Sequence, residues 1–148
     1  MTGIIDVSSS ANRWSWNFDE HIPSDTGEGR RVLQELLMQL ERHEWGEHDT
    51  FGIHLAVEEA LVNAIHHGNQ DDLDKKVHVV FRVSPTQVRI EISDEGSGFD
   101  PTSVPDPTEE ENLEIPCGRG LMLMRNFMSL IEFNDLGNAV TMEKSRSE

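Results

Sequence analysis

The hydrophobic pattern of the chain changes period several times, and this succession limits the folds that it can adopt. Residues 13–18 alternate polar and apolar side chains, which is typical of a strand. Two segments with apolar residues at helical spacing follow, ending near His43 and at Gly68. Residues 77–83 and 87–93 alternate again and predict a hairpin.

The second half of the chain predicts a long loop, a helix and another hairpin. Residues 94–118 contain glycines, prolines and an acidic run, and they are too long for a plain connector. The almost wholly apolar residues 120–129 predict a helix, and residues 130–134 and 138–143 predict strands. This order favours an α+β fold, a two-layer sandwich with helices on one face of a mostly antiparallel sheet. We expect one domain, with residues 1–12 as a flexible terminus.

Capping residues set the expected starts of the first two helices. Pro23, Ser24 and Asp25 offer a start for the first helix. Either Asp49 or Thr50 is expected to cap the second.

Composition excludes several classes of function. The 148 residues include 28 acidic and 12 basic side chains, and the resulting formal charge of −16 repels nucleic-acid phosphates. An acidic surface suits a basic protein partner or simple solvation. No apolar run approaches the roughly 18–20 residues of a membrane span, and no secretory signal is visible. The single cysteine, Cys117, excludes an internal disulfide and suits a reducing, cytoplasmic setting.

The second helix carries a group of polar residues on one side. At 100° per residue, Asn63 and His66 lie within about 40° of Glu59, and the apolar stripe lies about 150° away. A carboxylate that accepts a proton beside an amide oxygen that ligates Mg²⁺ suits phosphoryl transfer to a hydroxyl. The alternative is a solvated helix face. Glu58 falls outside the group and is interpreted as surface charge.

Two glycine-containing clusters follow. Asp94 at the end of a strand can accept a hydrogen bond from an exocyclic amine such as that of adenine, and Gly96 and Gly98 allow a close approach of the backbone. Gly118 and Gly120 flank Arg119 at a helix start, where free N–H groups favour a phosphate. The alternatives are an Asp-rich turn and an exposed cation.

Together these segments resemble the ATP-binding domains of DNA gyrase, a heat-shock chaperone, sensor histidine kinases and a mismatch-repair ATPase. Within that superfamily the chain is most similar to the anti-sigma-factor serine kinases, which are partner-switching regulators. Residues 59–68 (EALVNAIHHG) resemble their N box, residues 94–99 (DEGSGF) the first glycine box, and residues 118–128 the second. The likeness extends from about Trp14 to Lys144.

The resemblance implies ATP and Mg²⁺ as cofactors. Glu59 would be the general base, Asn63 the Mg²⁺ ligand and Asp94 the contact to the adenine amine. The further nucleotide contacts that it implies are His67, Gly96, Gly98, Gly118, Arg119, Gly120, Leu121 and Asn138. Residues 101–117 would form a lid, and either Arg30 or Arg31 would sense phosphate.

The resemblance also implies the partners. The chain would phosphorylate an anti-anti-sigma antagonist of the STAS type, hold a sigma factor when that antagonist is modified, and form a homodimer. One alternative is a non-catalytic ATP-binding module that only presents a surface to partners. Another is the catalytic part of a histidine kinase, but the chain has no coiled-coil helix for a phosphoacceptor histidine.

Overall fold

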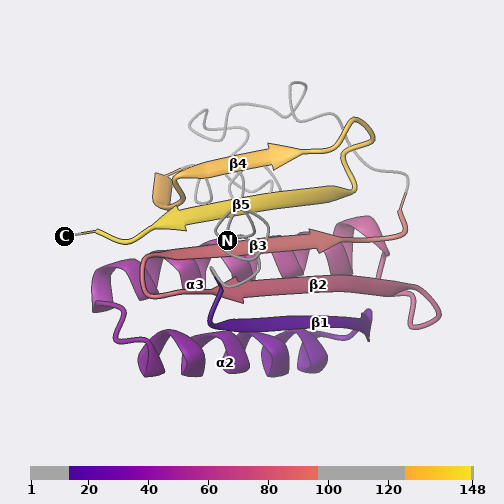
Figure 1. Cartoon of the computed structure of the whole chain (residues 1–148). Coiled ribbons are helices and arrows are strands. Elements are labelled where there is room, and N and C mark those ends of the chain that lie inside the picture. The colour runs from indigo at the N-terminus through magenta and orange to yellow at the C-terminus, as the bar shows by residue number, and fades with distance from the viewer. Residues whose placement is uncertain (1–13, 97–125, 148) are drawn as a thin grey trace, which may run out of the picture.

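The computed structural model describes residues 14–96 and 126–147 (Figure 1). The strands are β1 (Trp16–Pro23), β2 (Lys76–Val83), β3 (Gln87–Ser93), β4 (Leu130–Phe133) and β5 (Ala139–Ser145). The helices are α2 (Thr26–Arg42) and α3 (Glu47–Val62), and α3 continues as the π-helix η1 (Asn63–Gly68). Within these described residues, no helix combines the length and the apolar character that a membrane crossing requires.

The strands form one five-stranded sheet in the order β1-β2-β3-β5-β4, and every neighbouring pair is antiparallel. Along β2 and β3, alternate side chains are buried, because a strand points successive residues to opposite faces. One face packs against the two helices, which lie behind the sheet in Figure 1. This arrangement confirms the predicted α+β fold with helices on one face of an antiparallel sheet.

The core lies between the helices and this buried face. Its largest fully buried side chains come from both layers, which shows that sheet and helices share one hydrophobic cluster. They are Ile22, Val32, Leu36, Leu40, Ile53, Val57, Ile65, Val77, Phe81, Ile90 and Met142. Burial of side chains of this size stabilises each by roughly 1.5–3 kcal/mol relative to exposure, so the layer contact dominates the stability of the fold.

The ends of several elements differ from the prediction. β1 runs from Trp16 to Pro23 and is therefore shifted toward the C-terminus of the predicted strand. Asp25 caps α2, as predicted, and its side chain accepts the N–H of Glu28 at 3.2 Å. Three predicted features lie wholly or mostly outside the described residues. They are the flexible terminus over residues 1–12, the loop over residues 94–118 and the helix over residues 120–129.

The predicted cap of the second helix is wrong. Gly46 is the N-cap of α3, and Asp49 and Thr50 lie inside the helix. Asp49 is only 3% exposed and accepts hydrogen bonds from the backbone N–H and the hydroxyl of Ser147, both at 2.7 Å. Lys144 lies 3.7 Å from the same carboxylate. Asp49 therefore anchors the C-terminal end of the chain to α3 rather than capping the helix.

The environment of Asp49 acts on its pKa in opposite directions. Desolvation alone would raise the pKa, but the two hydrogen bonds from Ser147 and the positive charge of Lys144 outweigh it. The pKa of Asp49 is consequently lowered from its ordinary value of 3.8. A carboxyl whose pKa is lower in the folded state stabilises the fold above its unfolded-state pKa and loses that effect in acid.

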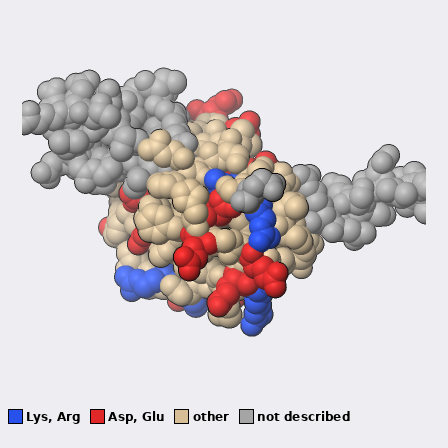
Figure 2. Space-filling model, turned by 90° about the vertical axis from the view of Figure 1, so that its left-hand side faces the viewer, with Lys and Arg blue, Asp and Glu red and all other residues tan. Residues whose placement is uncertain are grey.

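Surface charge is mixed at the end of the molecule where the chain leaves β5 and where β2 turns into β3. Figure 2 views this end, and acidic and basic side chains lie side by side on it. The excess of acidic residues thus forms no uniform negative surface on this described face. Exposed pairs of opposite charge contribute little to stability, typically under about 1 kcal/mol each.

We predict that Asp49→Ala lowers the free energy of unfolding by roughly 1–3 kcal/mol at pH 7, because it leaves the donors of Ser147 without their acceptor. Glu47→Ala, an exposed acid in the same helical turn, should cost about 0.3–1 kcal/mol. Urea unfolding at several pH values measures both. The difference between wild type and Asp49→Ala should shrink as the pH falls below about 4. A difference that is constant down to about pH 2 would contradict this account.

Candidate functional site

The end of the second helix meets the end of β3 at an unusually short distance. A Cβ atom placed on Gly68 would lie 2.3 Å from Cγ of Asp94. A Cβ atom on Gly96 would lie 2.1 Å from the carbonyl oxygen of Gly68. Both separations are far below van der Waals contact, so only glycine fits at either position. The structure thereby brings together Gly68, at the end of the segment 59–68, and Asp94 and Gly96, at the start of the segment 94–99.

Asp94 is a half-buried carboxylate at this junction. It accepts the N–H of Gly96 at 2.8 Å. Desolvation raises the pKa of Asp94, and the hydrogen bond from Gly96 and the charge of Lys75 only partly oppose the shift. An ionised carboxylate here is destabilising in the free protein, and a hydrogen-bond donor on a bound ligand would relieve this cost.

Asn69, which follows the helix directly, fixes the position of the Asp94 loop. Its side chain is fully buried. The amide donates to the hydroxyl of Ser24 at 2.9 Å and to the carbonyl of Lys76 at 3.0 Å, and its oxygen accepts the N–H of Glu95 at 2.7 Å. Sequence reasoning missed this residue. The signal was a polar residue after a helix-ending glycine, but its partners come from three separate segments.

Asn138 holds the same loop from the other side. Its backbone carbonyl accepts the N–H of Asp94 at 2.9 Å, and its side-chain amide donates to the carbonyl of Gly96 at 3.2 Å. Asn134 stabilises the turn between β4 and β5, because its side chain accepts the N–H of Asn138 at 3.0 Å. Asn138 thus lies at the junction, next to two of the predicted nucleotide contacts.

The helix that carries Glu59 and Asn63 changes geometry at Asn63. It is α-helical to Val62 and π-helical from Asn63, and the N–H of Asn69 bonds to the carbonyl of Ala64, five residues earlier, at 2.9 Å. The rotation of 100° per residue therefore does not apply beyond Val62, and the predicted angular position of His66 needs correction. Short π-helical segments of this kind occur frequently at functional sites in proteins.

Asn63 presents a chemical signal of its own. Its side-chain oxygen Oδ1 is buried and accepts no hydrogen bond within the described part of the chain. A buried amide oxygen without a donor is costly, and such oxygens are suitable ligands for Mg²⁺. The donor chemistry of Asn63 therefore fits the metal that the sequence predicted. Glu59, one turn earlier on the helix, is partly buried.

The two histidines near the helix end differ in their environments. Nδ1 of His66 lies 2.5 Å from Oδ1 of Asp71, so this ring is held by the turn that follows the π-helix. His67 is exposed. Its proximity to a nucleotide stays a prediction.

The sequence spacing did not choose between Arg30 and Arg31 as the phosphate-sensing residue, but the environments of the two side chains differ. Arg31 forms ion pairs with Glu20, Glu28 and Glu35, and its hydrogen bonds to Glu20 and Glu28 raise its pKa. Arg30 lines a groove between α2 and α3, together with Glu58. The guanidinium of Arg31 is thus already neutralised by carboxylates, and Arg30 is the better candidate for a phosphate contact.

The remaining predicted contacts fall outside the described residues. They are Gly98, Gly118, Arg119, Gly120, Leu121 and the lid over residues 101–117.

Comparison with known proteins identifies relatives of this architecture. The family model described as "Histidine kinase-like ATPase domain" matches residues 22–144. The serine/threonine-protein kinase BtrW of Bordetella bronchiseptica is 31% identical over 94 residues. That match covers 62% of this chain and 66% of the relative, slightly less than two thirds of the relative's length.

We predict that Gly68→Ala destabilises the protein by roughly 1–3 kcal/mol, because the new methyl group overlaps the side chain of Asp94. Gly46→Ala is the matched control. A Cβ there meets nothing within 4 Å, and the loss of a glycine N-cap should cost under about 1 kcal/mol. Thermal unfolding of both variants measures the difference.

A double-mutant cycle identifies the clashing partner. The atoms nearest the added Cβ all belong to the side chain of Asp94, so Asp94→Ala should recover most of the stability lost in Gly68→Ala. If the two substitutions were strictly additive, the close contact described here would not exist.

Proposed function

The chain belongs to the histidine kinase-like ATPase domain family, and from this we propose that it is an ATP- and Mg²⁺-dependent serine/threonine protein kinase acting in partner switching. The observation that carries the proposal is the junction of Gly68, Asp94 and Gly96, which holds a half-buried carboxylate where a helix end and a strand end meet. The side-chain oxygen of Asn63 on the same helix, which has no hydrogen-bond partner among residues 14–96 and 126–147, supports it.

In this proposal, Asp94 accepts a hydrogen bond from the adenine amine. The raised pKa of Asp94 reflects burial, so a donor from the base would replace the water that the carboxylate has lost. The amine on adenine is a donor, whereas guanine has a carbonyl oxygen at the equivalent position. The site should therefore prefer ATP to GTP. The backbone of Gly96 and the side chain of Asn138 would complete the wall around the base.

Asn63 would hold Mg²⁺ through Oδ1. The ion would supply positive charge that offsets the negative charge of the phosphates during transfer. Gly98, Gly118, Arg119, Gly120 and Leu121 remain proposed contacts to the nucleotide, and residues 101–117 the proposed lid, on the strength of the sequence resemblance.

Glu59 would act on the protein substrate. A carboxylate near the bound nucleotide can accept the proton of a serine hydroxyl as that oxygen bonds to the γ-phosphorus and the bond to ADP breaks. General-base catalysis of this kind contributes about 10²–10⁴-fold to a rate. Glu59 lies on the same helix as Asn63, four residues earlier, which would place the base and the metal ligand on neighbouring turns.

The protein partners follow from the resemblance and from the relative named a serine/threonine-protein kinase. We propose that the substrate is a STAS-type anti-anti-sigma protein and that the unphosphorylated substrate competes with a sigma factor for the chain. A second candidate function is a non-catalytic module, in which ATP shapes the binding surface and no phosphate is transferred. The partial exposure of Glu59 is compatible with either function.

We predict that Glu59→Gln lowers phosphate transfer from labelled ATP to a purified STAS-type substrate by about 10²–10⁴-fold, because glutamine cannot accept the proton. ATP affinity should be retained, since the contacts of Asp94 are unchanged. Glu58→Gln, which removes the neighbouring and exposed carboxylate, is the control and should retain activity.

Undiminished transfer by Glu59→Gln would refute Glu59 as the base. If the wild type binds ATP but transfers no phosphate, the non-catalytic module is the correct function.

A further inference from the structure

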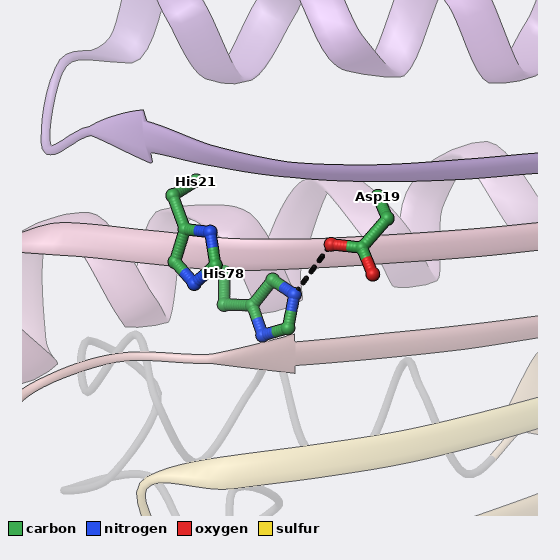
Figure 3. Close-up of side chains that lie close together, drawn as sticks. All are labelled: Asp19, His21 and His78. Carbon is green, nitrogen blue, oxygen red and sulfur yellow. Dashed lines mark hydrogen bonds and ion pairs between the residues drawn. The ribbon is translucent and has the colours of Figure 1, made fainter.

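The face of the sheet turned away from the helices carries a group of side chains that the proposed nucleotide site does not use. Asp19 and His21 belong to β1, and His78 belongs to β2 (Figure 3). His21 and His78 are directly opposite each other in the antiparallel register, and Asp19 precedes His21 by two residues. Because strand side chains alternate between faces, all three project from the same face, away from the helices.

The three side chains are close together. The rings of His21 and His78 are stacked, with centroids 4.0 Å apart and planes inclined by 6°. Nε2 of His78 lies 2.7 Å from Oδ1 of Asp19. One potential ligand atom from each residue falls within 4.8 Å of the other two. Figure 3 shows the carboxylate and both imidazoles gathered over the two strands.

We propose that Asp19, His21 and His78 bind a divalent transition-metal ion, for which Zn²⁺ is the best match. Two imidazole nitrogens and one carboxylate oxygen are a ligand set that zinc commonly takes, with water in the fourth position. Magnesium and calcium prefer oxygen ligands, so this site differs in chemistry from the Mg²⁺ site proposed at Asn63.

The charges around the group favour a cation. Among the described residues, Asp19 pairs with His78 and with no lysine or arginine. Its carboxylate is therefore not already neutralised by a permanent positive charge. The formal charge of the chain, −16, adds a general attraction for cations.

Only small side-chain movements are needed to close the site. In a tetrahedral site, zinc–ligand bonds of about 2.0–2.2 Å place two ligand atoms about 3.3–3.6 Å apart. The three potential ligand atoms here lie within 4.8 Å of one another. His78 is the more buried of the three and can serve as the fixed ligand, whereas Asp19 and His21 are exposed. The ion would take the place of the hydrogen bond between Nε2 of His78 and Asp19, with the ring hydrogen of His78 carried on Nδ1, and the two rings would turn out of their parallel stack.

A metal here would join the edge strand to its neighbour. Among the described strands, β1 is at one edge of the sheet and pairs only with β2. His78 also pairs in register with Ser93, which directly precedes Asp94. The proposed metal site and the junction at Gly68 therefore lie on opposite faces of adjoining segments of the sheet.

We predict that nucleotide-free protein binds one Zn²⁺ per chain in calorimetric titrations carried out in a Cys117→Ser background, which removes the only thiol. His21→Ala and His78→Ala should each weaken this binding by more than about tenfold, since even residues that only support a ligand account for about 10–100-fold. His54→Ala is the matched control, because His54 also lies 3.7 Å from a carboxylate, that of Glu58, but belongs to no group of three potential ligands among the described residues. It should bind as the background does.

Two further measurements test the site even if a histidine variant folds poorly. Asp19→Asn preserves the shape of an exposed side chain and should also weaken Zn²⁺ binding. Saturating Zn²⁺ should raise the melting temperature of the background protein by roughly 5–10 °C at about 100 times its Kd, and that of His21→Ala by much less. Excess Mg²⁺ should not compete. The proposal is overturned if the background protein binds no Zn²⁺, or if His21→Ala, His78→Ala and Asp19→Asn bind it as tightly as His54→Ala.

Discussion

The close approach of Gly68 to Asp94 and Gly96 determines how the two layers meet at the candidate site. The helix end can approach the carboxylate of Asp94 and the backbone of Gly96 this closely only because Gly68 and Gly96 carry no side chains. The same approach removes water from the carboxylate of Asp94, which raises its pKa. Packing and electrostatics at this junction are therefore two results of one geometric requirement.

Several features keep the junction in place. Asn69 connects the helix end to the segments before α2, at the start of β2 and after β3, and Asn138 connects the β4–β5 turn to the loop of Asp94. The π-helical turn over residues 63–68 ends at Gly68 and includes the oxygen of Asn63, which has no hydrogen-bond partner among the described residues. A partly buried charge and a buried oxygen without a donor both cost stability, and such groups are concentrated at functional sites.

Periodicity predicted the layers, the antiparallel sheet and the helix ending at Gly68, because these depend on local alternation of apolar side chains. Periodicity did not predict contacts between residues that are far apart in the sequence. Asp49 resembles a helix cap in sequence, but its partner Ser147 is 98 residues away. The partners of Asn69 and the register that pairs His21 with His78 are likewise non-local. The switch to π-helical geometry at Asn63 has no signal in the residue pattern.

The central claim is that Asp94 is kept in a desolvated position to recognise adenine. Calorimetric titration of ATP and GTP against wild type and Asp94→Asn tests it most directly. The account predicts that wild type prefers ATP, and that Asp94→Asn weakens ATP binding by at least about tenfold, the order expected for a hydrogen bond to a charged group. Its melting temperature at about pH 7 should be unchanged or higher, because the raised pKa makes the ionised carboxylate destabilising. Equal affinity of the wild type for the two nucleotides, or unaltered ATP binding by Asp94→Asn, would contradict it.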